Sequence, residues 1–263
     1  QEYINGTCRT AECTLKVIQP VTGINIDSSI QMNVGESKKI NATVSPDNAS
    51  NKTLTWESDN PSVATVDSQT GEVTCKSRGF ATITAKATDG SNISATCQVE
   101  VKQLVTDINL IDMQINVGET KQVQAEVLPE NANEKALTWS SSDNTIATVD
   151  SNGNVIGISK GTATITATAK DSSNVSATCE VEVKQQVADI SLNKTELSLY
   201  IGREEKLTAT VNPDNANDPT LTWSSDNSEV ATVDQNGNVK AISRGQAVIT
   251  VTANDGSGET ATC

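Results

Sequence analysis

Three tryptophans recur at almost equal intervals and set the period of the whole chain. Trp56, Trp139 and Trp223 lie 83 and 84 residues apart, each within the same phrase: LTWESDNPSVATVD, LTWSSSDNTIATVD and LTWSSDNSEVATVD. A period of this size, with matched loops as well as matched apolar positions, indicates that one folded unit has been copied in tandem. The chain is therefore predicted to be an array of similar domains.

Within each copy, apolar residues alternate with polar ones, as in Ala81, Ile83 and Ala85. Such alternation turns one face of a strand toward a core and the other toward water. The stretches SPDNASN, SDNPS and SQTGE between these runs are turn formers, spaced at about 8 to 12 residues as in a sandwich. No segment has apolar residues at helical spacing. The pattern predicts an all-β chain of tandem immunoglobulin-like antiparallel β-sandwiches, with about seven short strands in each.

The repeats also predict where the domains begin and end. Residues 4–21 align without a gap on residues 88–105, and the last copy stops at Cys263, the counterpart of Cys97 and Cys179. We therefore assign 1–20 to the last hairpin of a preceding repeat, 21–103 to domain 1, 104–186 to domain 2, and 187–263 to domain 3 with an incomplete final strand. The junctions EVKQLV and EVKQQV hold neither Gly nor Pro, which predicts restricted angles between domains.

Two explanations of these offset ends remain open. The favoured one is an arbitrary cut through a longer array. The alternative is donor-strand exchange, in which an incomplete strand leaves backbone groups unpaired and invites another chain to add a strand. In that case Cys13, Leu15 and Val17, which have the missing alternation, are the strand donor of another copy and build a fibre.

Composition excludes several classes of function. The chain has no histidine, which removes Ser-His-Asp catalysis and imidazole metal sites. A formal net charge of −14 opposes binding to nucleic acid, which needs clustered Lys and Arg. No apolar run approaches the roughly 20 residues of a membrane span. The polar clusters recur in every copy, whereas an active site needs a unique convergent set of groups, so we expect no enzyme.

The repeated phrases resemble the group 2 bacterial Ig-like domain (BIG2). The similarity runs from residue 21 to 263 and includes, in order, the elements SxxVGE or its variants, TW-S-D, ATVD, GxV, GxATIT and ATC-V-V. The third copy departs from the first of these at SLYIGREEK, where Ile201 replaces the usual Val. The resemblance implies extracellular modules. It also implies use as tandem stalks in bacterial surface adhesins of the intimin and invasin type, in secreted enzymes, or in phage structural proteins.

Structural roles are predicted for the residues that recur once per copy. The three tryptophans are expected to fill the cores, because each lies on the inward phase two residues after a leucine. Structural roles extend to Cys13, Cys97, Cys179 and Cys263, which recur once per copy at the same alternation phase and are expected to be buried free thiols. A Cys8 to Cys13 or Cys75 to Cys97 disulfide remains open in an oxidising compartment.

The acidic loops are a weaker candidate for a site. SPDNASN, LPENANEK, NPDNANDP and the tips TDGS, KDSS and NDGS carry oxygen ligands of the kind that calcium prefers. None has the spacing of a known calcium loop, and Asn, Asp and Gly are ordinary turn residues. We expect solvated turns and no cofactor, with calcium as the alternative.

A non-catalytic extracellular stalk or spacer of a bacterial surface or structural protein explains these features best. The alternatives are a module that binds a host surface protein or polysaccharide, an accessory part of a secreted enzyme or phage structural protein, and a self-assembling fibre. The expected partners are neighbouring repeats of the array, with no nucleic acid and no membrane insertion. The expected location is the bacterial cell surface, the secreted fraction or a virion.

Overall fold

The computed structural model describes residues 3–4, 7–8 and 12–263. Every regular element in these residues is a β-strand, as the alternation predicts. The chain divides into two compact units, residues 1–105 with 129–134, and residues 106–128 with 135–263. The first unit holds the whole first repeat together with residues 104–105 and 129–134 of the second, and the second unit holds the rest of the second repeat and the third. The short strands β1 (Tyr3–Ile4) and β2 (Thr7–Cys8) pair with each other ahead of the first repeat.

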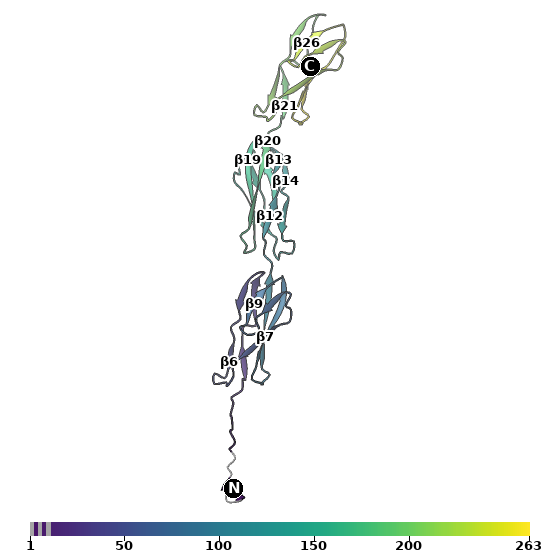
Figure 1. Ribbon diagram of the computed structural model, residues 1–263. Helices are drawn as coiled ribbons and strands as arrows, with labels where there is room; N and C mark the ends of the chain where they lie inside the picture. The colour runs from purple at the N-terminus through teal and green to yellow at the C-terminus, as the bar shows by residue number, and fades with distance from the viewer. Residues whose placement is uncertain (1–2, 5–6, 9–11) are drawn as a thin grey trace. The chain divides into compact units, whose positions relative to one another are not determined.

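The first repeat is a sandwich of a four-stranded and a three-stranded sheet, with a further strand pair (Figure 1). The four-stranded sheet has the order β4-β11-β10-β7, the three-stranded sheet the order β5-β9-β8, and the extra pair is β3-β6. The bounds are β3 Gly23–Asn25, β4 Ser29–Asn33, β5 Ser37–Lys39, β6 Thr43–Ser45, β7 Leu54–Ser58, β8 Ala64–Val66, β9 Glu72–Cys75, β10 Gly79–Ala87 and β11 Ser94–Lys102.

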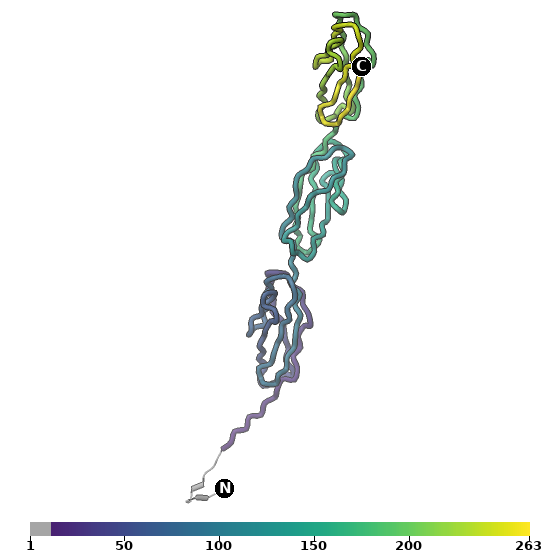
Figure 2. The backbone as a smooth tube through the Cα atoms, turned by 90° about the vertical axis from the view of Figure 1, so that its right-hand side faces the viewer, coloured from purple at the N-terminus to yellow at the C-terminus, as the bar shows by residue number. Residues whose placement is uncertain are grey.

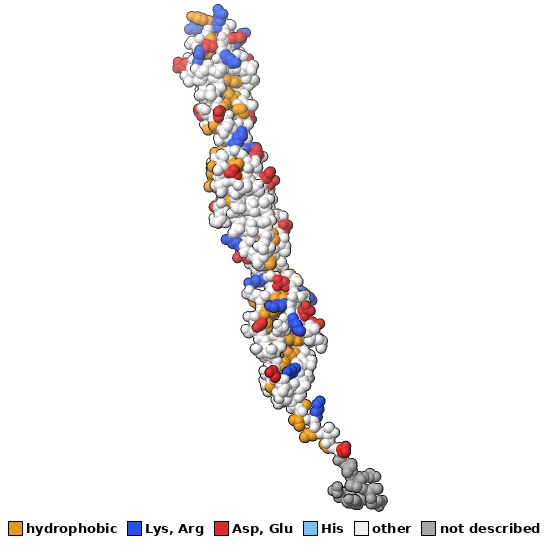
Figure 3. Space-filling view, turned by 90° about the vertical axis from the view of Figure 1, so that its left-hand side faces the viewer, with side chains coloured by type: hydrophobic (Ala, Val, Ile, Leu, Met, Phe, Trp, Pro, Cys, Tyr) orange, Lys and Arg blue, Asp and Glu red, His pale blue; other side chains and the backbone are white. Residues whose placement is uncertain are grey.

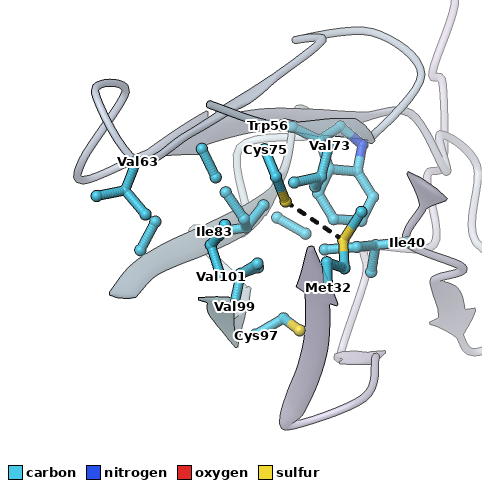
Figure 4. Packing of buried hydrophobic residues seen from close by; sticks show 13 residues of the cluster. Met32, Ile40, Trp56, Val63, Val73, Cys75, Ile83, Cys97, Val99 and Val101 are labelled. Carbon is cyan, nitrogen blue, oxygen red and sulfur yellow. Dashed lines mark hydrogen bonds between the residues drawn. The ribbon is translucent and has the colours of Figure 1, made fainter. Parts of the chain in front are cut away.

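Alternation along the long strands builds the core of this repeat. In β10, Ala81, Ile83 and Ala85 are buried while the residues between them face outward. The register sets Ile83 opposite Cys97 and Ala85 opposite Trp56. Figure 4 shows Ile83, Cys97 and Trp56 in one cluster with Val73 and Met32 of other strands. A one-residue slip would turn this whole set to solvent, so the apolar pattern specifies the register.

One pair of strands differs from the antiparallel arrangement expected. β4 runs parallel to β11, with Ser29 opposite Gln98 and Asn33 opposite Lys102. The cause is that the first stretch of the repeat changes sheets: β3 pairs antiparallel with β6, and the chain then crosses to β11 as β4. Because the first stretch is divided into β3 and β4, and the next into the separate strands β5 and β6, the repeat has nine strands where about seven were expected.

The second repeat has the same plan. Its sheets have the orders β13-β20-β19-β16 and β14-β18-β17, with the pair β12-β15, and β13 is again parallel to β20. The alternation of Val123, Ala125 and Val127 in this copy predicts that all three face inward, but Ala125 is exposed. The bounds are β12 Asp107–Leu110, β13 Met113–Asn116, β14 Thr120–Gln122, β15 Ala125–Leu128, β16 Leu137–Ser141, β17 Ala147–Val149, β18 Asn154–Gly157, β19 Gly161–Ala169 and β20 Ser176–Lys184.

The third repeat has a three-stranded sheet where the others have four strands. The order is β24-β27-β28, beside β22-β26-β25 and the pair β21-β23. In the described residues 187–263 no strand occupies the place of β4. The bounds are β21 Asp189–Leu192, β22 Glu204–Lys206, β23 Ala209–Asn212, β24 Leu221–Ser225, β25 Ala231–Val233, β26 Asn238–Ala241, β27 Ile249–Ala253 and β28 Thr260–Thr262.

Each complete repeat is elongated along its strands. Figure 2 shows the backbone entering a repeat at one end and leaving it at the other. On the faces seen in Figure 3, acidic and basic side chains are interspersed and no patch of one sign forms. None of the described segments is a helix that could cross a membrane.

Candidate functional site: linkers and loops of each repeat

The tryptophans lie in the cores, each covered by a glycine turn. Trp56 and Trp223 are 7% exposed, and Trp139 is half-buried against its core. A Cβ placed on Gly71 would lie 2.7 Å from Trp56 Cε2, and one on Gly153 would lie 2.9 Å from Trp139 Cζ2. Each ring therefore packs against the bare backbone of a glycine, and Trp139 stays partly exposed.

The five cysteines whose side chains the structure describes are free thiols. Cys75, Cys97 and Cys179 are buried and Cys263 is half-buried, whereas Cys13 is exposed. Cys75 Sγ faces Met32 Sδ at 3.8 Å rather than Cys97, so the structure does not form the Cys75 to Cys97 pair (Figure 4). Cys13 is a free thiol, and the predicted alternative of a Cys8 to Cys13 bridge falls on a Cys8 side chain that lies outside the described residues.

Burial predicts which thiols react. Desolvation raises the pKa of Cys75, Cys97 and Cys179 above the ordinary thiol value, and the thiolate is the reactive form. In the folded protein we expect iodoacetamide to label Cys13 rapidly and these three at least about 100-fold more slowly, since alkylation there requires local opening. Peptide mapping by mass spectrometry measures the rates, and labelling in urea is the control. Equal rates in the folded protein would contradict the buried assignment.

The proposed strand donor lies outside any sheet. Cys13 is exposed, and Leu15 and Val17 are each 83% exposed. Residues 12–22 form no strand. In the described part of the chain, none of these three residues is paired with a strand.

Aspartates of the predicted acidic loops, and of other turns, bind their own backbone. Asp89 Oδ1 of the tip TDGS accepts from Ser91 N at 2.9 Å, and Asp218 Oδ1 of NPDNANDP accepts from Thr220 N at 3.0 Å. Asp67 Oδ1 accepts hydrogen bonds from the N–H groups of Gln69 and Thr70 at 3.0 and 2.8 Å, and Asp150 and Asp234 make similar bonds. Hydrogen bonds from Thr70 hold the pKa of Asp67 below its ordinary value. In the described part of the chain no three His, Cys, Asp or Glu side chains gather as metal ligands.

The residues before each repeat are bound to a loop of that repeat. Gln19 N donates to Ser50 Oγ at 2.8 Å, and Ser50 N donates to Gln19 O at 2.9 Å. The same reciprocal pair joins Gln103 to Asn133, at 2.8 and 2.9 Å, and Gln185 to Asn217, at 2.7 and 2.8 Å. Each linker is thereby held to the repeat that follows it.

An aspartate at a hairpin tip fixes the linker a second time. Asp89 Oδ2 accepts from Val21 N at 2.6 Å, and Asp255 Oδ2 accepts from Val187 N at 2.5 Å. Val21 and Val187 are buried beside Ala49 and Ala216, respectively, of the anchoring loops. Hydrogen bonds from Ser91 and Val21 lower the pKa of Asp89; burial opposes the shift at Asp255, but bonds from Ser257 and Val187 outweigh it.

This aspartate predicts an acid-dependent contribution to stability. Because the folded pKa of Asp89 lies below the unfolded value of about 3.9, its contribution is complete above that value and is lost as the pH falls through the folded pKa. The Asp89→Asn variant should be less stable than wild type at pH 6, and the difference should shrink by pH 2.5. Urea unfolding of the first repeat at both pH values measures it; a difference independent of pH would contradict the role of the carboxylate.

Sequence reasoning did not find these linker contacts. The signals were present, since Val21, Val105 and Val187 recur and the loops SPDNA, LPENA and NPDNA hold the same alanine. Their pairing joins residues about 30 positions apart, so it depends on how the strands fold back.

The fold and these linkers define tandem Ig-like modules, and the family follows from comparison with known proteins. The family described as Bacterial Ig-like domain (group 2) matches residues 20–99, 105–181 and 186–263. The chain belongs to this family.

Relatives place such repeats in several kinds of protein. An uncharacterized protein of Clostridium acetobutylicum is 41% identical over 56% of this chain and 15% of its own length. The Ig-like virion protein of Serratia phage KSP90 is 41% identical over 36% of this chain and 38% of its own length. An alpha-L-arabinofuranosidase of Bifidobacterium longum is 33% identical over 56% of this chain and 15% of its own length. The chain thus spans well under half the length of these relatives.

Among solved structures, human CDH23 EC21-23 is matched over 92% of this chain and 98% of that one. The TM-score is 0.46 and the identity is 16%.

Proposed function

We propose that this chain is a non-catalytic stalk or spacer segment of an extracellular bacterial or virion protein. Domains of this fold are generally non-catalytic. The described residues gather no metal-ligating cluster and leave no buried polar side-chain atom without a partner. The chemistry of the chain is that of its turns and cores.

The linkers carry this proposal. A spacer needs successive modules that keep their distance, and a linker that is free to rotate does not provide it. Here the residues Gln103 and Gln185 pair with the loops of the following repeats, as Gln19 does with the first. Because these bonds recur before each of the three repeats, few backbone torsion angles of each linker remain free to rotate.

The relatives support an accessory role. The matching segment is only 15% of the arabinofuranosidase's length, so most of that protein lies outside the matched repeats. The phage relative is a virion protein by name. A spacer serves in either setting without chemistry of its own.

Single-molecule FRET tests the spacer. Dyes attached through non-natural residues at exposed Lys86 and Lys170 report the distance between the first two repeats. We expect a narrow distance distribution that broadens in Asn133→Ala, which removes the acceptor for Gln103 N, and stays narrow in Asn133→Ser. The serine is the matched control, because Ser50 makes the equivalent bond in the first repeat.

A distribution in wild type as broad as in a variant with Gly-Gly-Ser-Gly inserted after Lys102 would contradict the spacer. Equal broadening in the Ala and Ser variants would show that the side-chain acceptor is not what restricts the linker.

A further inference from the structure

We propose that the parallel strand pairs β4·β11 and β13·β20 are mechanical clamps, which let the complete repeats bear tension along the chain. The proposal deepens the stalk function and rests on it, since a stalk that holds a head against flow is pulled at its two ends. It concerns what happens inside each repeat under that load.

The clamp is a continuous ladder in each complete repeat. In the first, the pairs run from Ser29 opposite Gln98 to Asn33 opposite Lys102. Gln98 N donates to Ser28 O at 2.9 Å before the ladder, and Val34 N donates to Lys102 O at 2.9 Å after it. In the second repeat Val117 N closes the ladder on Lys184 O at 2.9 Å.

The positions of the two strands in the chain decide how they are loaded. Tension reaches β4 from the linker before it, through Val21 and β3, and leaves β11 directly through Lys102. β4 is therefore pulled toward its own N-terminus and β11 toward its C-terminus. Because the strands are parallel, these pulls are opposed along the strand axes and shear the ladder.

Shear loads many hydrogen bonds at the same time. Ladder bonds run between the strands, so sliding one strand along the other strains all of them together, whereas peeling a strand from its end breaks them one by one. Forced unfolding depends on the unfolding rate and so on the barrier that this shared loading raises. The parallel pair is thus the element that resists pulling.

Side chains on the outer face connect the same two strands. Gln31 Nε2 donates to Glu100 Oε2 at 2.6 Å, and Lys102 Nζ donates to Gln31 Oε1 at 3.2 Å. In the second repeat Lys184 Nζ donates to Gln114 Oε1 at 2.8 Å. These bonds cross the plane along which the strands would slide.

The third repeat is an internal comparison. Its segment with Leu197 and Leu199 packs against the core without forming a strand. In the described residues β28 pairs with β27 alone, at Thr260, Ala261 and Thr262. In this 263-residue chain the third repeat therefore has a similar core without the clamp.

Force spectroscopy on the whole chain, held by peptide tags at its two ends, tests the proposal. We expect three unfolding steps, two at high force and one at clearly lower force, each lengthening the molecule by less than the roughly 260–290 Å that about 80 fully extended residues span. The steps are assigned by variants in the first repeat.

Ile30→Pro is the decisive variant. Since the Ser28 carbonyl and the Val34 N–H both face β11, alternation points the N–H of Ile30 there too. Proline removes it, and one of the two high-force steps should fall to the force of the third repeat. Ile30→Ala controls for the side chain. Ser29→Pro, whose N–H faces the open edge of the sheet where proline is tolerated, should keep both high-force steps.

Val34→Pro tests the ladder if Ile30→Pro does not fold, as judged by urea unfolding. Val34 precedes Gly35 (φ +86°) in a turn closed by Glu36 N to Asn33 O at 3.0 Å, and such a turn accepts proline at this position. Proline then removes only the hydrogen bond from Val34 N to Lys102 O. The unfolding force of one high-force step should fall, and Val34→Ala should lower that force less.

Three equal forces in wild type would overturn the clamp, and so would equal effects of Ile30→Pro, Ile30→Ala and Ser29→Pro. Either result leaves the FRET outcome intact, so failure of the clamp is distinguishable from failure of the spacer.

Discussion

Trp56→Ala is expected to lower the free energy of unfolding of the first repeat by about 3–5 kcal/mol. The ring is 7% exposed and contacts the core beneath β10, so its loss leaves a cavity that the strands cannot close. A domain of about 80 residues has roughly 4–12 kcal/mol of stability in total, and the first repeat should therefore be partly unfolded at 37 °C.

Hydrogen exchange with mass spectrometry at increasing urea measures this effect repeat by repeat in the intact chain. Glu57→Ala on the same strand, with an exposed side chain, is the control and should change stability by no more than about 0.5 kcal/mol. Protection of the second and third repeats should stay the same. A loss below about 1 kcal/mol in Trp56→Ala would mean that the ring is not a main part of the core.

Gly71→Ala is expected to destabilise the first repeat by about 2–5 kcal/mol, from backbone strain and overpacking together. Gly71 has φ +73°, and its new Cβ would lie 2.7 Å from Trp56 Cε2. Gly90 has φ +87° with nothing within 4 Å of the new Cβ. Gly90→Ala therefore measures strain alone, at about 1–2 kcal/mol.

A double-mutant cycle separates the two causes at Gly71. In the Trp56→Ala background the ring is gone, and the cost of Gly71→Ala should fall to that of Gly90→Ala. Urea unfolding of the single and double variants provides the four free energies. An undiminished cost in that background would show that the ring does not restrict Gly71.

The candidate site was harder to predict than the core. The Trp phrases and the alternation located Trp56, Ile83 and Cys97, because burial of one face of a strand is recorded in the order of residues. Sequence reasoning interpreted Asp89 and the loop at Ser50 as solvated turns, with calcium binding as the alternative. Their hydrogen bonds to Val21 and Gln19 link distant positions, and nothing local in the sequence distinguishes an aspartate that holds a linker from one that caps its own turn, as Asp67 does.

The sequence by itself determined that the chain is a tandem array of β-sandwiches and which residues face their cores, since a period of two along each strand and one tryptophan per copy are local records of burial. Only the tertiary structure decided that β4 leaves its first partner to run parallel to β11, and that each linker is bound to the repeat after it. The physical reason is that strand pairing is made by backbone groups, which every residue carries alike, so the partner is chosen by how the whole chain folds back.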